Sequence, residues 1–512
     1  MKLRAVIPAL LVFASAAPAL TDPGNNLPPR EITMRECVET ALRNNVDVAV
    51  SRMEKEIGAL GIPVEKAAFL PRFSGEIGAG RSIIPTGSVL DNSLSVDQRT
   101  YTLDLGVRDL LLTGTSLSFA FENQRQESDS AVSLLSPEYR TALTLRAQQP
   151  LLKNFGRKVT GAPLAIARAG AAEKTEEWKA AVMDVVAAAR TAFLAFYTAA
   201  GEVEVRRGAL DLAERLLVQT DARIEAGSMA PMDRLPADAA AAARREELLR
   251  AEAAAQGAAD DLRIVLGIRD DAEWGERIFP AELTAEIPPP GKMESFEEAL
   301  RRRPEFSAQA ARESQAEIRE AVARNQALPS LDLSLSAGLS GLSGSPNPSP
   351  LFPSSTVGEF DGGYGESLDQ AFSGRYYNWF VGLSTEIPWR LEREKAEWAR
   401  ARAAAAQQRL LGESLSSKIR VEVRKARRDL ASALARIEAG RASAASAAKQ
   451  LEAEERKLEL GRSIVFQVLR YQQDLSEARL ALLRARTDAY AAQTRLWRAV
   501  GTILEKEGIV VR

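Results

Sequence analysis

Residues 328–338 read LPSLDLSLSAG and mark the point at which a helical pattern changes into a strand. Pro329 cannot continue the helix that precedes it. After the proline, Leu331, Leu333 and Leu335 alternate with small or polar residues, which is the period of a strand with one apolar and one polar face. The sequence therefore predicts a helix that ends at a proline and passes directly into an amphipathic strand.

The same junction occurs earlier in the chain. Residues 70–80 read LPRFSGEIGAG, and residues 36–80 align without a gap on residues 294–338. Upstream, ETALR at 39–43 corresponds to EEALR at 297–301. Two separate matches in one register indicate an internal duplication, which predicts a structure built from two copies of one unit.

The duplication and its flanks divide the chain into six segments. They are a signal peptide (1–19), an N-terminal extension (20–33), a first repeat (34–268), a Pro-rich linker (269–293), a second repeat (294–503) and a C-terminal tail (504–512).

The N-terminus has the pattern of a secretory signal. Lys2 and Arg4 precede an apolar run from Ala5 to Ala14, and small residues end at Ala19. The run is shorter than the roughly 20 residues of a spanning helix. Beyond it we find no continuous apolar stretch approaching about 18 residues, which predicts that strands, not helices, enter any bilayer.

Each repeat has the same predicted order of elements. They are an opening helix (34–70 or 293–328), strands (about 72–149 or 330–387), a long helix (about 161–226 or 391–460) and a returning helix that ends at Leu266 or Val500. Glycines at 227 and 461 mark the turns after the long helices. At about 1.5 Å per residue, each long helix would be on the order of 100 Å in length.

The first long helix carries an apolar stripe with steps of four and three residues, the spacing of a coiled-coil seam. The stripe consists of Val182, Val186, Ala189, Phe193, Phe196, Ala200 and Val203.

The strand regions suit a membrane. The first repeat contains four strand-like runs and the second contains two, each near the 9 to 11 residues that cross a bilayer. Arg146 lies on a polar face, which should therefore look into a lumen. The polar segments 82–98, 125–138 and 340–375 are interpreted as aqueous loops.

The strand count predicts shared barrels. A chain offers six strands, or four if the middle hairpin of the first repeat stays outside the membrane, and the smallest single-chain barrels have about eight. Because open edges in lipid leave backbone groups unpaired, several subunits should share one barrel. Two chains of four strands would fill the interior with side chains, whereas three chains would give twelve or eighteen strands and room for water.

Composition excludes several classes of function. Lysines and arginines number 67 against 69 acids, so no basic field attracts nucleic acid. The chain has no histidine, the commonest general base and metal ligand, and a single cysteine, Cys37, which excludes an internal disulfide. We expect no catalytic, cofactor-binding or metal-binding residues, and therefore no enzyme.

The whole pattern resembles the TolC-like outer membrane efflux family. The resemblance is carried by the doubled order of elements, the Leu-Pro junctions, QQPLL at 148–152 and the glycine turns. It implies a mainly helical fold with membrane strands, and a homotrimer with a shared β-barrel in the outer membrane. A helical tunnel in the periplasm would dock with an adaptor protein and an inner membrane transporter, to export small molecules or polypeptides.

The resemblance also implies that the turns after Gly227 and Gly461 line the periplasmic entrance, where acidic residues ring the pore. Asp233 matches such a position, whereas Gln467 and Arg470 stand where acids are common in the second turn. A ring of Arg470 would favour anions. We hypothesise that Asp233 pairs with Arg462 or Arg470 to close the entrance. The alternative is that these are solvated turn residues.

Two alternatives stay open. The first repeat has one hairpin more than the second, which puts the family expectation of four strands per subunit in question. The long helices alone would also suit a periplasmic coiled-coil adaptor or structural envelope protein, and less well an envelope enzyme with a helical stalk. The amphipathic strands and the duplication argue against an adaptor.

Overall fold

The computed structural model describes residues 30–87, 90, 94–283, 286–291, 295–347, 358–387 and 389–510. The predicted signal peptide at 1–19 lies outside these residues. The chain forms two compact units, and each is assembled from segments of both repeats. Unit 1 takes its described residues from 1–49, 182–299 and 422–512, and unit 2 from 50–181 and 300–421.

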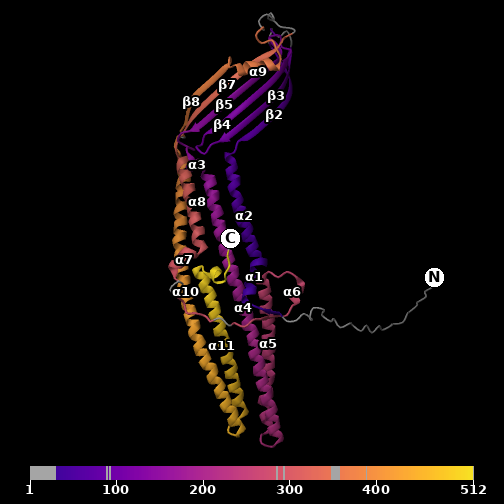
Figure 1. Cartoon of the computed structure of the whole chain (residues 1–512), viewed down its shortest axis with the longest axis vertical. Coiled ribbons are helices and arrows are strands. Elements are labelled where there is room, and N and C mark those ends of the chain that lie inside the picture. Colours follow the sequence, from indigo (N-terminus) through magenta and orange to yellow (C-terminus); the bar gives the residue numbers. More distant parts are fainter. Residues whose placement is uncertain are drawn as a thin grey trace, which may run out of the picture. The chain divides into compact units, whose positions relative to one another are not determined.

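Both repeats run from opening helices through strands to a long helix and a returning helix, but they differ in the strand region (Figure 1). The first repeat contains α1 (Met34–Asn44), α2 (Val46–Lys66), β2 (Arg72–Pro85), β3 (Ser95–Leu110), β4 (Ser116–Ser128), β5 (Leu135–Pro150), α3 (Arg157–Thr160), α4 (Ala162–Glu225) and α5 (Arg234–Leu266). The second contains α7 (Phe296–Arg302), α8 (Pro304–Gln326), β7 (Ser330–Pro346), α9 (Tyr364–Ser373), β8 (Tyr377–Glu386), α10 (Glu392–Glu459) and α11 (Val465–Val500). The other elements in the described part of the chain are short: β1 (Arg30–Ile32), α6 (Asp271–Gly275), β6 (Ile278–Pro280), α12 (Ile503–Lys506) and the 3-10 helices Ala67–Phe69 and Pro231–Asp233.

The opening helix of each repeat is broken, although the sequence predicted one continuous helix. The breaks fall at Asn45 and Arg303, which are aligned positions, and both residues have extended backbone angles. Arg303 precedes Pro304, and the residue before a proline avoids the helical region. Asn45 is held differently: its side chain donates to the carbonyl of Val265 at 3.0 Å and accepts from the amide of Asp47 at 2.8 Å.

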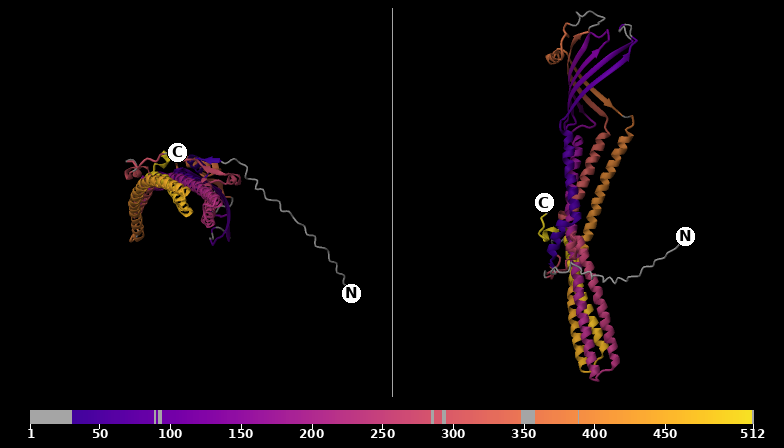
Figure 2. Two further views of the ribbon diagram at one scale, coloured as in Figure 1. Left: turned by 90° about the horizontal axis from the view of Figure 1, so that it is seen from below. Right: turned by 90° about the vertical axis from the view of Figure 1, so that its right-hand side faces the viewer.

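Unit 2 contains a single antiparallel sheet with the strand order β2-β3-β4-β5-β7-β8. The observed strands cover the predicted runs to within one residue at each end and are mostly longer, so parts of the predicted loops are strand. Figure 2 shows the strands of this sheet together with the helices they join in unit 2. Charged contacts connect these helices: Arg312 of α8 binds Glu173 of α4 at 2.6 Å, and Lys174 binds Glu54 of α2 at 3.1 Å.

A helix interrupts the predicted loop at 340–375. This helix, α9, packs on β5 and β7, where the hydroxyl groups of Ser367 and Thr141 are hydrogen-bonded at 2.9 Å. Gly341 of β7 makes the close approach possible, because a Cβ at this position would lie 1.9 Å from the carbonyl oxygen of Ser367. The glycine in this strand therefore serves contact with a second backbone.

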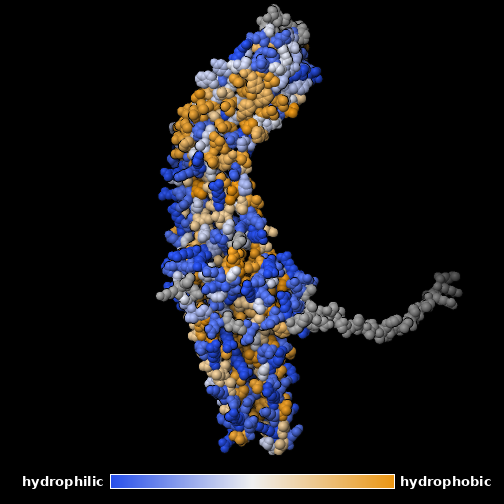
Figure 3. All heavy atoms as spheres, viewed as in Figure 1, coloured by the Kyte–Doolittle hydropathy of each residue, from blue (hydrophilic) through white to orange (hydrophobic). Residues whose placement is uncertain are grey.

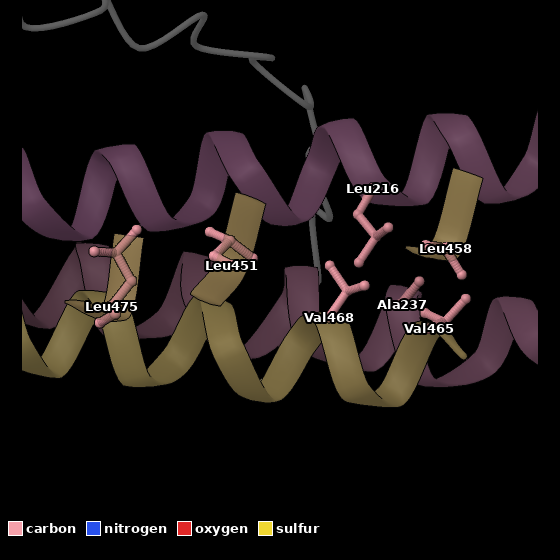
Figure 4. Close-up of a cluster of buried hydrophobic side chains, with 8 residues drawn as sticks. Leu216, Ala237, Leu451, Leu458, Val465, Val468 and Leu475 are labelled. Carbon is pink, nitrogen blue, oxygen red and sulfur yellow. The ribbon is translucent and has the colours of Figure 1, made fainter. Parts of the chain in front are cut away.

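Unit 1 contains two helical hairpins, formed by α4 with α5 and by α10 with α11 (Figures 1 and 2). The predicted apolar stripe on α4 is buried, except for Ala200, which is half-buried. Near the turns, buried side chains from all four helices form one cluster (Figure 4). It consists of Leu216, Ala237, Ala447, Leu451, Leu458, Val465, Val468 and Leu475.

Unit 1 also holds segments from the outer parts of the sequence. β1, in the predicted N-terminal extension, pairs in parallel with β6. Arg190 of α4 is buried, forms an ion pair with Glu507 after α12, and donates to the hydroxyl of Thr494 at 2.9 Å. The guanidinium also lies 4.9 Å from the ring centre of Trp497. Burial lowers the pKa of Arg190, and Glu507 opposes that shift.

The helix α4 corrects one sequence prediction. By length and composition it is able to cross a membrane, with a mean hydropathy of 1.5 over an 18-residue window. The prediction that no such segment follows the signal is wrong on this criterion. Half of the window is buried inside the structure, and the core helix of a protein that does not cross a membrane meets the same criterion.

Candidate functional site

Both predicted turns have the same backbone geometry. Gly227 and Gly461 adopt positive φ angles of 71° and 68°, the left-handed region that favours glycine. Each turn contains a pair of hydrogen bonds typical of a Schellman motif, from Gly227 to Ile224 and from the next residue back to Arg223. The second turn repeats this pattern around Gly461. The two hairpins therefore end in equivalent turns.

Asp233 has a local role in the first turn. Its carboxylate accepts a hydrogen bond from the backbone N–H of Ala230 at 3.2 Å, at the start of the short 3-10 helix Pro231–Asp233 that leads into α5. The adjacent Arg234 binds Asp221 of α4 at 2.8 Å. Side chains thus close the first turn within one chain.

Arg462, one predicted partner of Asp233, lies in the second turn, and the other, Arg470, lies near the start of α11. Arg462 and Arg470 are exposed, and Gln467 is half-buried. Across the described ranges, no ion pair joins Asp233 to either arginine. The hypothesis of a closing pair between turns therefore stays a prediction, and it requires a contact between different chains.

The second turn is closed by a different residue, Glu454 of α10. Its carboxylate accepts from the hydroxyl of Ser463 at 2.6 Å and binds the ammonium of Lys457 at 2.9 Å. These hydrogen bonds lower the pKa of Glu454, and the one from Ser463 contributes most. The sequence analysis missed this residue, because an acid nine positions before a serine has no distinctive signal.

A second contact missed from the sequence joins the ends of the two long helices. The guanidinium of Arg223 on α4 donates to the carbonyl oxygen of Leu458 on α10 at 2.9 Å. The same carbonyl also accepts the backbone N–H of Gly461 at 3.1 Å, so Arg223 provides a second donor to it. The two repeats are therefore linked directly beside their turns.

The register of the sheet sorts its side chains into two faces. Val107 of β3 lies opposite Phe73 of β2 and opposite Phe119 of β4, which in turn lies opposite Leu145 of β5. Leu145 lies opposite Ala337 of β7, so the apolar row crosses the middle hairpin without interruption.

The apolar face is exposed. Its exposed large side chains are Phe73, Ile77, Leu103, Leu105, Phe119, Leu145, Leu335, Trp379, Val381 and Leu383. Figure 3 shows an apolar patch over the strands. Contiguous exposed apolar surface of this kind marks contact with a membrane or a protein. Arg146 lies on the opposite, polar face, as the alternation predicted.

Among the residues that the structure describes, no group of three or more His, Cys, Asp or Glu side chains is placed to hold a metal ion. Cys37 is buried, and burial raises the pKa of its thiol to about 12, which disfavours the reactive thiolate. The features that remain are the two turns and the amphipathic sheet.

Solved structures with the same fold are outer membrane channels. The CmeC outer membrane channel of Campylobacter jejuni is 14% identical, with a TM-score of 0.64 over 92% of this chain and 85% of that chain. The outer membrane protein VceC of Vibrio cholerae is 15% identical, with a TM-score of 0.64 over 91% and 96% of the two chains. The MtrE outer membrane channel of Neisseria gonorrhoeae is 17% identical, with a TM-score of 0.58 over 92% and 89%. No curated protein matches the chain significantly.

The sequence itself matches a family model. The model described as outer membrane efflux protein matches residues 37–268 and 296–502, which covers both repeats. The prediction of an outer membrane efflux channel is confirmed, and the alternative of an adaptor or structural envelope protein is not favoured. On this match over most of its length, the chain belongs to the outer membrane efflux protein family.

Proposed function

We propose that three copies of this chain form one efflux channel, in which their sheets close a shared barrel in the outer membrane. The observation that carries the proposal is the open amphipathic sheet, in which the edge strands β2 and β8 each have one neighbour. An open edge in lipid costs several kcal/mol for each unpaired backbone group. Pairing of β2 with β8 of a second chain would remove both edges.

All six strands enter this barrel, which then contains eighteen strands in the trimer rather than twelve. The support comes from the β3–β4 hairpin, the surplus of the first repeat. Its apolar residues Leu105 and Phe119 are exposed and lie on the same face as those of the other strands. A hairpin outside the membrane would have no reason to continue that face.

The helical hairpins form the periplasmic part and contact an adaptor protein, which connects the channel to an inner membrane transporter. Support comes from large apolar side chains that are exposed around the two turns, as expected of a surface that binds another protein. They are Met232, Leu235, Leu460, Ile464 and Phe466. The channel conducts small molecules or polypeptides and catalyses no reaction.

The turns form the entrance, which we propose is closed by ion pairs between chains from Asp233 to Arg462 or Arg470. The exposed positions of both arginines support this role. With Gln467 and Arg470 in place of acids, the entrance favours anions. Replacement of Asp233 by Ala should raise single-channel conductance and antibiotic permeability, and unchanged values would remove the gating role.

The native mass of the protein in mild detergent, after extraction from purified outer membranes, tests the proposed function. We expect a mass near three mature chains in the outer membrane fraction. A monomer in the soluble periplasmic fraction would overturn the proposal.

A further inference from the structure

We propose that Arg72, Arg108 and Arg146 form an arginine row that attracts anionic solutes inside the barrel. The inference rests on the proposed channel, because the polar face of the sheet becomes a lumen only when several chains close a barrel. It concerns the sheet, and is independent of the residues at the helical turns.

The strand register brings the three arginines together. Arg72 of β2 lies opposite Arg108 of β3, which lies opposite Ser118 of β4, and Ser118 lies opposite Arg146 of β5. Directly opposite residues have Cβ atoms about 4.5–5.5 Å apart. The arginine row therefore spans four neighbouring strands on the polar face.

The positive charge of the arginine row is not neutralised within the chain. All three side chains are exposed, and none forms an ion pair with any residue in the described part of the chain. Like charges directly opposite each other destabilise a sheet. Guanidinium groups bind carboxylates and phosphates through paired hydrogen bonds. The arginine row is thus available to counterions and to solutes that carry these anionic groups.

Three acidic residues lie on the same polar face as the arginine row, but further along the strands. Glu76, Asp104 and Glu122 are opposite one another on β2, β3 and β4 and form an acidic row. Glu76 comes four positions after Arg72, which is about 13 Å along a strand. This exceeds the Debye length of about 8 Å at physiological ionic strength, so each row acts largely on its own.

The space between the two rows is lined by small side chains. The intervening row consists of Ser74, Gly106, Ala120, Thr144, Gly338 and Asn378. The arginine row lies nearer to the ends of the strands that join the helices, because Arg72 follows Pro71 directly and Arg146 comes four residues before Pro150. A solute that arrives from the helices meets the arginine row before the acidic row.

Reversal potentials of the purified channel in planar bilayers, under a gradient of KCl, test the inference. The variant R72Q/R108Q/R146Q keeps polar side chains of similar length but removes the charge. We expect its permeability ratio of chloride to potassium to fall roughly threefold, the factor for a change of about half a kT in local potential, because anions and cations respond in opposite directions. The difference should shrink in 1 M salt, where the Debye length is about 3 Å.

Two controls make the measurement specific. Arg99→Gln removes a charge from the other face of β3 and should leave the ratio unchanged. The variant E76Q/D104N/E122Q neutralises the acidic row and should shift the ratio in the opposite direction.

A triple variant that conducts with the ratio of the unmodified protein would overturn the inference. If the triple variant does not assemble, Arg108→Gln alone should give a smaller shift in the same direction, and no shift would again overturn it. Unmodified protein that forms no channel would instead contradict the proposed function.

Discussion

The helices of unit 1 bury many of their apolar side chains, whereas the sheet of unit 2 leaves many of its apolar side chains exposed. Leu496 of α11 is completely buried, whereas Phe73 and Ile77 of β2 are 82% and 85% exposed. The helical hairpins complete their core within one chain, and the sheet does not. On the proposed function, lipid and neighbouring chains supply the contacts that the sheet lacks within one chain.

The largest expected effect comes from the interior of unit 1. Glu507→Ala would leave Arg190 buried without its ion-pair partner, which should lower the free energy of unfolding by about 3–5 kcal/mol. Urea unfolding of the detergent-solubilised protein, followed by helical circular dichroism, measures this change.

The matched control breaks an exposed ion pair on the same helix, Glu204 with Arg207. Glu204→Ala should cost less than about 1 kcal/mol. Equal effects of the two variants would show that Arg190 is accessible to water, and would contradict the contrast in burial between unit 1 and the sheet.

A charge on the apolar face of the sheet should have the next largest effect. Leu145→Arg places a guanidinium toward lipid and should destabilise the assembled channel by about 2–4 kcal/mol near the bilayer centre. The neighbouring Thr144→Arg points to the polar face and should be tolerated. Thermal stability of the trimer on semi-native gels compares the two variants, and a greater loss for Thr144→Arg would reverse the assignment of faces.

The glycine turns should give a smaller effect. Gly461→Ala forces a side chain into the left-handed region and should cost about 1–2 kcal/mol. Gly208 lies within α4 and has open space around it, so Gly208→Ala should be neutral or stabilising by up to about 1 kcal/mol. The two free energies come from the same urea titration. Equal costs would mean that the turn geometry contributes no stability.

The smallest expected effect is the change with pH in the alkylation rate of Cys37, a measure of solvent access to the core of unit 1. Because burial raises the pKa of the thiol to about 12, ionisation begins only far above pH 9. Alkylation of the folded protein should therefore stay slow from pH 7 to pH 9 and become rapid in denaturant. An engineered cysteine at the exposed Ser228, in a Cys37→Ala background, should react quickly throughout this range. Rapid alkylation of folded Cys37 would indicate an open core.

Local signals predicted much of the fold. The proline junctions gave the change from helix to strand, and the glycines at 227 and 461 gave the turns, because each residue acts on its own backbone. The ends of both long helices and of both returning helices lie within two residues of the predicted positions.

Features that depend on distant residues were not predicted. The break at Asn45 requires a carbonyl from Val265, and α9 requires the space above Gly341. Alternation showed that Arg146 is on a polar face, but only the pairing register placed it in one row with Arg108 and Arg72. The partners of Arg223 and Arg190 also lie far away in the sequence. Spacing along the chain carries no information on such contacts.

In the proposed channel, β2 of one chain pairs with β8 of the next chain. A cysteine scan tests it most directly, with Ser74→Cys on β2 combined with single cysteines along Tyr377–Glu386 of β8, in a Cys37→Ala background. We expect some pairs to form disulfides in purified outer membranes and to yield a covalent ladder that ends at three chains. No cross-link at any position, or a ladder that ends at a different number of chains, would contradict it.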